Sequence, residues 1–125
     1  MIAIDACVVI SFLADEKTAQ AVRLEALLGT GEAVLAPSVV TELLSDPSAG
    51  GESAALIEGL IQLPLLDGYW SRAGMLRAAI RRAGRKAALG DALLAQACLD
   101  ADCALLTADT DFKAFAELAG LRLER

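Results

Sequence analysis

The sequence contains no histidine among its 125 residues. A chain without histidine cannot build a Ser/His/Asp triad, a Cys/His nucleophile pair or a zinc site with histidine ligands. Any catalysis must therefore use carboxylates, metal ions, lysine or thiol groups.

Long hydrophobic runs are also missing. Hydrophobic residues make up 56% of the chain and the mean hydropathy is +0.52, yet no apolar run approaches the ~20 residues of a membrane-spanning helix. The first residues, Met1 to Ala3, lack the basic leader of a signal peptide. We therefore expect a cytoplasmic protein without membrane association, folded as a single domain over residues 1–125.

Cysteine is scarce, with only Cys7, Cys98 and Cys103. An odd number of irregularly spaced cysteines in a non-secreted chain argues against a disulfide framework. We interpret them as buried thiols.

The net charge of −6 argues against a nucleic-acid partner, but the charges are unevenly distributed. Six of the eleven basic residues lie in one stretch without an acid: Arg72, Arg77, Arg81, Arg82, Arg85 and Lys86. Such a run is often only the solvated face of a helix. It also suits a track for phosphates beside an acidic pocket.

Strand-like and helix-like patterns alternate along the chain. Strands are expected at residues 2–5, 33–36, 64–66 and 103–107, with a short edge strand at 121–123. Helices are expected at residues 7–13, 16–28, 38–45, 53–63, 69–82 and 92–99, and after residue 111. This order predicts an α/β fold, a three-layer α/β/α sandwich with a mainly parallel central sheet.

Four acids stand at positions where such a fold binds ligands, outside the carboxyl ends of the strands. Asp5 closes the first strand, and Asp109 follows the strand that ends at Thr107. Glu42 comes three residues after Val39, at the border of the apolar face of its helix.

The fourth acid, Asp91, begins the i, i+3, i+4, i+7 stripe that continues with Leu94, Ala95 and Cys98. Carboxylates directed inward need compensation, and a divalent cation supplies it. Oxygen ligands alone favour Mg²⁺ or Mn²⁺ over Zn²⁺.

Each acid also has a purely structural explanation. Asp91 could cap a helix, Asp109 could form a turn, and Glu42 could be a solvated helix residue. Asp5 has little structural purpose beyond capping the helix that follows it. The pattern as a whole carries more weight than any one member.

Four segments together resemble the signature segments of PIN-domain nucleases: residues 2–10 (IAIDACVVI), 37–43 (PSVVTEL), 90–97 (GDALLAQA) and 105–112 (LLTADTDF). The resemblance covers essentially the whole chain and is greatest to VapC-type toxins of toxin–antitoxin pairs. It implies that Asp5, Glu42, Asp91 and Asp109 are catalytic metal ligands, with Asp111 as an accessory ligand.

The function implied by the resemblance is that of an Mg²⁺- or Mn²⁺-dependent endoribonuclease. A cognate antitoxin would mask the acidic pocket, and the toxin would be a homodimer. Because Arg81, Arg82, Arg85 and Lys86 directly precede Asp91, we predict that they guide the RNA backbone.

One residue departs from the family pattern, because Cys7 stands where the family usually has Ser, Thr or Asn. A thiol is a poor replacement for a hydroxyl hydrogen-bond donor. The alternative is therefore a PIN-like RNA-binding module or complex subunit with weak or no catalysis.

A phosphoacceptor receiver domain has a similar length and also clusters acids. It would need a paired acid after the first strand, but Asp5 is followed by Ala and Cys7. It would also need a lysine after a late strand, whereas Lys113 falls within the last predicted helix. The sequence favours the nuclease.

Overall fold

The computed structural model describes residues 1–124, so the last residue of the predicted domain, 125, lies outside it. Its centre is a four-stranded sheet in the order β3-β2-β1-β4, with every neighbouring pair parallel. The strands are β1 (Ile2–Ile4), β2 (Ala33–Leu35), β3 (Ile61–Gln62) and β4 (Ala104–Leu106). The central β2 is buried at every position, as expected for a strand covered on both faces. The predicted three-layer α/β/α fold is confirmed.

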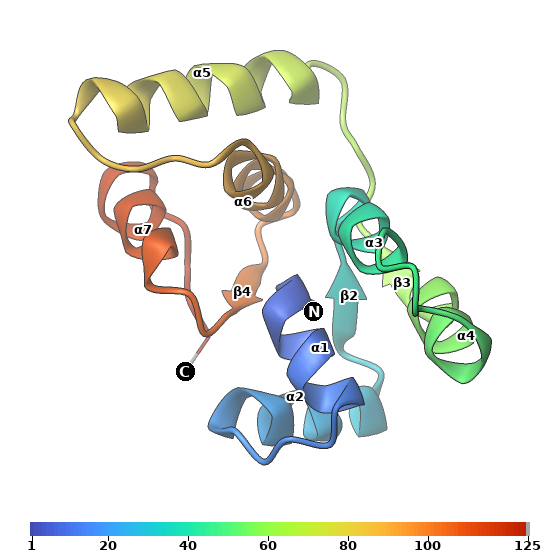
Figure 1. Cartoon of the computed structure of the whole chain (residues 1–125). Helices are drawn as coiled ribbons and strands as arrows, with labels where there is room; N and C mark the ends of the chain where they lie inside the picture. Colours follow the sequence, from blue (N-terminus) through green and yellow to red (C-terminus); the bar gives the residue numbers. More distant parts are fainter. Residues whose placement is uncertain (125) are drawn as a thin grey trace.

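Helices connect and cover these strands (Figure 1). They are α1 (Ala6–Leu13), α2 (Ala19–Thr30), α3 (Pro37–Leu44), α4 (Gly51–Gly59), α5 (Tyr69–Arg82), α6 (Leu89–Ala101) and α7 (Lys113–Ala119), with a 3₁₀ turn, η1, at Thr110–Phe112. Helix α1 packs against α2 and α3, whereas α5 packs against α6 and α7. Figure 1 shows α5 crossing the outer side of α6. Among residues 1–124, no helix has both the length and the apolar character to traverse a bilayer.

The third strand lies earlier than predicted. The preceding helix ends at Gly59 instead of continuing to residue 63, and β3 is Ile61–Gln62 instead of residues 64–66. The amide of Leu63 donates a last hydrogen bond to the carbonyl of Leu35 (2.9 Å). Pro64, the first residue of the predicted strand, comes directly after this last bond.

Other boundaries shift by a few residues, as helix and strand ends commonly do. Helix α2 begins at Ala19, not at residue 16, and α4 begins at Gly51, not at residue 53. The predicted edge strand at 121–123 is reduced to one parallel bridge between Leu105 and Leu123.

All three cysteines are free, and two of them are buried where α6 ends. The amide of Cys103 donates to the carbonyl of Cys98 (3.1 Å), and that of Asp102 donates to Leu99 (3.3 Å). Asp102 has a φ of 51°. These are the two bonds and the left-handed residue of a Schellman motif, in which an apolar contact commonly joins the positions of Cys98 and Cys103. The interpretation of this pair as buried thiols is confirmed.

Candidate active site

The predicted acids gather at the carboxyl end of the parallel sheet. Asp5 follows β1, Glu42 lies on α3 after β2, and Asp109 lies three residues beyond the end of β4. Asp91 is in the first turn of α6. The partial positive charge at the start of that helix favours a carboxylate there.

Asp5 is the most firmly held of the acids, with only 9% of its surface exposed. It is the N-cap of α1, and its Oδ1 accepts a hydrogen bond from the amide of Ala6 (2.8 Å). Its Oδ2 accepts from the Thr107 hydroxyl (2.6 Å) and from the Cys7 thiol (3.3 Å). The predicted capping role therefore accounts for one carboxylate oxygen only.

Thr107 connects two of the acids, a role that the sequence alone did not predict. Its hydroxyl donates to Asp5 and accepts a hydrogen bond from the amide of Asp109 (3.0 Å). The available signal was a hydroxyl residue at the end of an apolar strand, just before an acid. The hydrogen bond that gives Thr107 its role is made to Asp5, 102 positions away in the sequence.

The Cys7 thiol contacts the same Asp5 oxygen as Thr107, but at a longer distance. Burial, opposed in part by a backbone hydrogen bond from Ala108, raises the pKa of Cys7, and the charge of Asp5 raises it further. Cys7 is therefore a neutral thiol at neutral pH and a weak donor. The orientation of Asp5 does not depend on Cys7 alone, because Thr107 supplies the hydroxyl donor.

A second group of acids lies beside Asp5. One carboxylate oxygen from each of Asp91, Asp109 and Asp111 lies within 4.8 Å of the others. Asp109 is the N-cap of η1, and its Oδ1 accepts from the amide of Asp111 (2.8 Å). Asp111, expected as an accessory ligand, is thus a full member of this group.

Asp91 also belongs to a small cavity that it shares with Asp5 and Glu42. The cavity has a volume of about 30 Å³, enough for one or two water molecules, and Ser38 and Gly90 also line it. Glu42 is an exposed residue, and from its predicted place at the border of the apolar face of α3 it lines this cavity. Asp91 is the acid common to both groups.

Burial and the crowding of negative charge change the pKa of Asp91. Its burial, followed by the charges of Asp109, Asp5, Asp111 and Glu42, raises the pKa of Asp91 to about 6. Burial and the charge of Asp5 also raise the pKa of Glu42. An all-oxygen donor set with excess negative charge fits Mg²⁺ or Mn²⁺, and it lacks the imidazole and thiolate ligands typical of zinc.

Two of the four basic residues predicted to bind RNA form ion pairs with acids. Lys86 Nζ lies 2.9 Å from Asp111 Oδ2, and Arg85 pairs with Glu117 at 2.9 Å. Arg81 and Arg82 are exposed in the last turn of α5, and within residues 1–124 neither forms an ion pair. Of the four basic residues predicted to guide the RNA backbone, Lys86 is therefore the one that contacts the acids.

Several solved structures resemble the chain over its full length. The FitAcB structure from Neisseria gonorrhoeae has a TM-score of 0.75 at 19% identity, covering 100% of this chain and 97% of the other. VapBC2 from Rickettsia felis, bound to a DNA fragment from its promoter, has a TM-score of 0.75 at 18% identity, with 99% and 98% covered. VapBC-1 from nontypeable Haemophilus influenzae has a TM-score of 0.73 at 19% identity, with 99% and 97% covered.

At such identities the structural likeness concerns the fold, and no curated protein shows significant sequence similarity to the chain. The family model of the PIN domain, however, matches residues 2–118, nearly the whole sequence. The match includes all five predicted acids and all four strands of the sheet. The chain therefore belongs to the PIN domain family.

Proposed function

We propose that the chain is an Mg²⁺- or Mn²⁺-dependent endoribonuclease and the toxin of a toxin–antitoxin pair. The observation that carries the proposal is the position of Asp91, which joins both groups of acids. Burial and the charges of these acids raise the pKa of Asp91 to about 6. A structural carboxylate would normally face a cation or hydrogen-bond donors, whereas Asp91 faces four other acids. Membership of the PIN domain family supports nuclease chemistry at this place.

In this proposal Asp5, Glu42, Asp91, Asp109 and Asp111 hold one or two cations. Such a cation would supply Lewis acidity, which would polarise the phosphodiester, activate the attacking water and stabilise the leaving 3′ oxygen. The Thr107 hydroxyl orients the carboxylate of Asp5 and also holds the backbone amide of Asp109. Lys86 neutralises part of the charge of Asp111 and presents a cation to the approaching phosphate.

The direct test is a cleavage assay on single-stranded RNA with purified protein. Cleavage should require Mg²⁺ or Mn²⁺, stop with EDTA and be lost in Asp5→Asn. Equal cleavage by the variant, or indifference to EDTA, would contradict the proposal and point to a contaminating nuclease.

The alternative, a PIN-like RNA-binding module or complex subunit without catalysis, rests on Cys7. It predicts RNA binding without turnover at any concentration of metal. Because Thr107 also donates to Asp5, we favour the enzyme.

We expect Thr107→Val to lower the cleavage rate by about tenfold, the lower end of the range for a lost partner of a metal ligand. Cys7→Ser should leave the rate within a few-fold of the unmodified protein, since a hydroxyl would replace a weak thiol donor. Initial rates at saturating Mg²⁺ measure both effects. A larger loss in Cys7→Ser than in Thr107→Val would mean that the thiol is the essential donor.

We expect the double variant Arg81→Ala/Arg82→Ala to bind RNA more weakly and with less dependence on salt. Each phosphate contact contributes a slope of about −0.7 in log K against log salt for single strands, so losing two contacts should flatten it by about 1.4. Fluorescence anisotropy over a salt series measures this slope. Arg23→Ala, which removes an exposed cation on α2, is the control. An unchanged slope in the double variant would make the basic run a plain solvated surface.

The similar structures are VapBC and FitAB complexes, and by that likeness we propose that a cognate antitoxin covers the acidic pocket with a basic residue. We also propose that the chain is a homodimer. Light scattering of the purified chain, and co-purification with the product of an adjacent small reading frame, test these partners. A cytoplasmic location and a single domain over residues 1–125 stay predictions from the sequence.

A further inference from the structure

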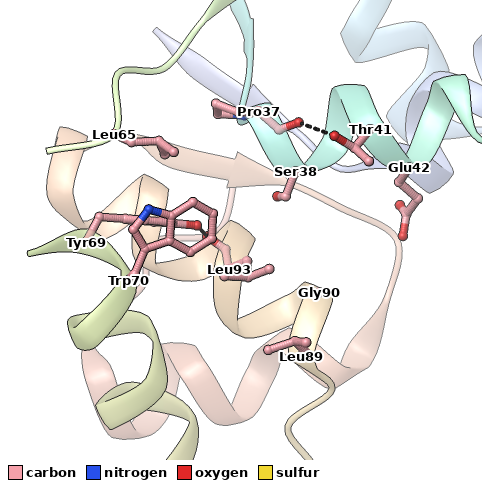
Figure 2. Close-up of a pocket in the computed structure, with 10 residues that line it drawn as sticks. All are labelled: Pro37, Ser38, Thr41, Glu42, Leu65, Tyr69, Trp70, Leu89, Gly90 and Leu93. Atoms are coloured by element: carbon pink, nitrogen blue, oxygen red, sulfur yellow. Dashed lines mark hydrogen bonds between the residues drawn. The ribbon is translucent and has the colours of Figure 1, made fainter.

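An apolar cavity of about 480 Å³ opens beside the acids (Figure 2). Its walls come from three separate segments: α3, the chain from Leu65 into the start of α5, and the first turns of α6. Leu65, Trp70, Leu89 and Leu93 supply apolar surface, and Figure 2 shows Ser38 pointing from α3 toward the opening. The volume is in the range of cavities that bind small organic groups.

The wall formed by α5 is firmly attached to α6. The Tyr69 hydroxyl donates a hydrogen bond to the carbonyl of Leu93 (2.7 Å). Arg72 Nη1 donates to the carbonyl of Asp67 (2.7 Å), while Arg72 Nη2 bonds to Asp100 on α6 (2.6 Å). The cavity is therefore preformed, and binding in it would cost little reorganisation.

Trp70 is the most exposed large apolar side chain of this wall, at 68%. Its ring meets that of Tyr69 edge to face, with centroids 5.0 Å apart and planes at 75°. An indole held by a neighbouring ring and open to solvent presents a π surface for a planar partner.

The cavity continues into the acidic site, because Ser38, Glu42 and Gly90 line both. Glu42 is the only charged residue of its lining, so the cavity disfavours a phosphate. A neutral planar group joined to a phosphate fits both parts at once. In RNA that group is a nucleobase next to the phosphate at the acids.

We propose that this cavity binds one unpaired nucleobase of the RNA substrate, next to the scissile phosphate, by stacking on Trp70. The proposal rests on the proposed ribonuclease function. A base paired within a duplex cannot enter such a cavity, so the substrate must be single-stranded there. Trp70 is thus assigned as a substrate-binding residue.

The test uses the fluorescence of Trp70, which is the only tryptophan of the chain. The Asp91→Asn protein is titrated with a short single-stranded RNA and with the same strand carrying an abasic nucleotide at each position in turn. We expect the intact strand to quench the fluorescence and one abasic strand to lose most of the quenching.

Variants give an independent measurement by anisotropy of labelled RNA. Trp70→Ala should bind about ten- to hundredfold more weakly, the usual effect of removing one stacking platform, and Trp70→Phe should recover part of the affinity. Met75→Ala is the matched control, because Met75 is equally exposed (66%) on the same helix but outside the cavity.

Binding without quenching, or equal quenching by all abasic strands, would overturn the proposal. A fluorescence that changes with protein concentration in the absence of RNA, together with a doubling of the mass in solution, would also overturn it. A second copy of the chain would then cover the cavity. These outcomes are separate from failure of the ribonuclease proposal, which would appear as absent cleavage by the unmodified protein whatever the result with Trp70.

Discussion

Asp91→Asn is expected to reduce RNA cleavage by about a thousandfold or more. Loss of a residue that only supports a metal ligand typically costs ten- to a hundredfold, and Asp91 is proposed as a ligand shared by both groups of acids. The amide keeps the size of the side chain and one oxygen, but it removes the negative charge. Initial rates on single-stranded RNA at saturating Mg²⁺ measure the effect.

The matched control for this variant is Asp102→Asn at the other end of α6. Asp102 is exposed, and its left-handed conformation (φ 51°) is one that asparagine also adopts. Its surface ion pair with Arg122 contributes little to stability. Asp102→Asn should therefore cleave RNA at the unmodified rate, whereas undiminished cleavage by Asp91→Asn would remove Asp91 from the site.

The same Asp91→Asn substitution is expected to stabilise the metal-free protein at neutral pH. Asp91 has a pKa of about 6 in the folded chain and an ordinary value of 3.8. Between these values the unfolded chain binds fewer protons than the folded one, so the free energy of unfolding falls as pH rises from about 4 to 6. The ionised carboxylate of Asp91 therefore lowers the free energy of unfolding above pH 6 and has no such effect below pH 4.

The size of this effect follows from the difference between a pKa of about 6 and the ordinary value of 3.8, at about 1.4 kcal/mol for each pH unit. About half of the full value is realistic for a half-buried group in contact with solvent, or roughly 1 to 1.5 kcal/mol. The melting temperature of Asp91→Asn in EDTA at pH 7.5 should accordingly rise by about 4 °C. At pH 4 the two proteins should melt together.

With bound metal, the unmodified protein should become more stable than Asp91→Asn. At one hundred times its dissociation constant, a bound cation adds about 2.7 kcal/mol to the unmodified protein and less to the variant. Calorimetry with Mg²⁺ and with EDTA, at pH 7.5 and pH 4, separates the effects. A variant less stable than the unmodified protein in EDTA at pH 7.5 would show that Asp91 has a structural role.

The periodicity of apolar residues was sufficient to predict most of the helices and strands, because it reflects which side chains are buried. Leu94, Ala95 and Cys98, which share the stripe of Asp91, are all buried as the helical period predicts. The third strand was misplaced because Pro64-Leu-Leu66 is as apolar as Ile61-Gln62-Leu63. Only the pairing of Leu63 with Leu35 distinguishes the two segments.

The residue types and their order were enough to predict a parallel α/β fold, a site without histidine and acids at one edge of the sheet. Which of these groups lie in contact follows from the folded structure. The link from Thr107 to Asp5, the inclusion of Asp111, the pairing of Lys86 with Asp111 and the cavity beside Trp70 join segments far apart in the chain. These contacts depend on distances between atoms in the folded protein, and residue types and their spacing along the chain do not contain those distances.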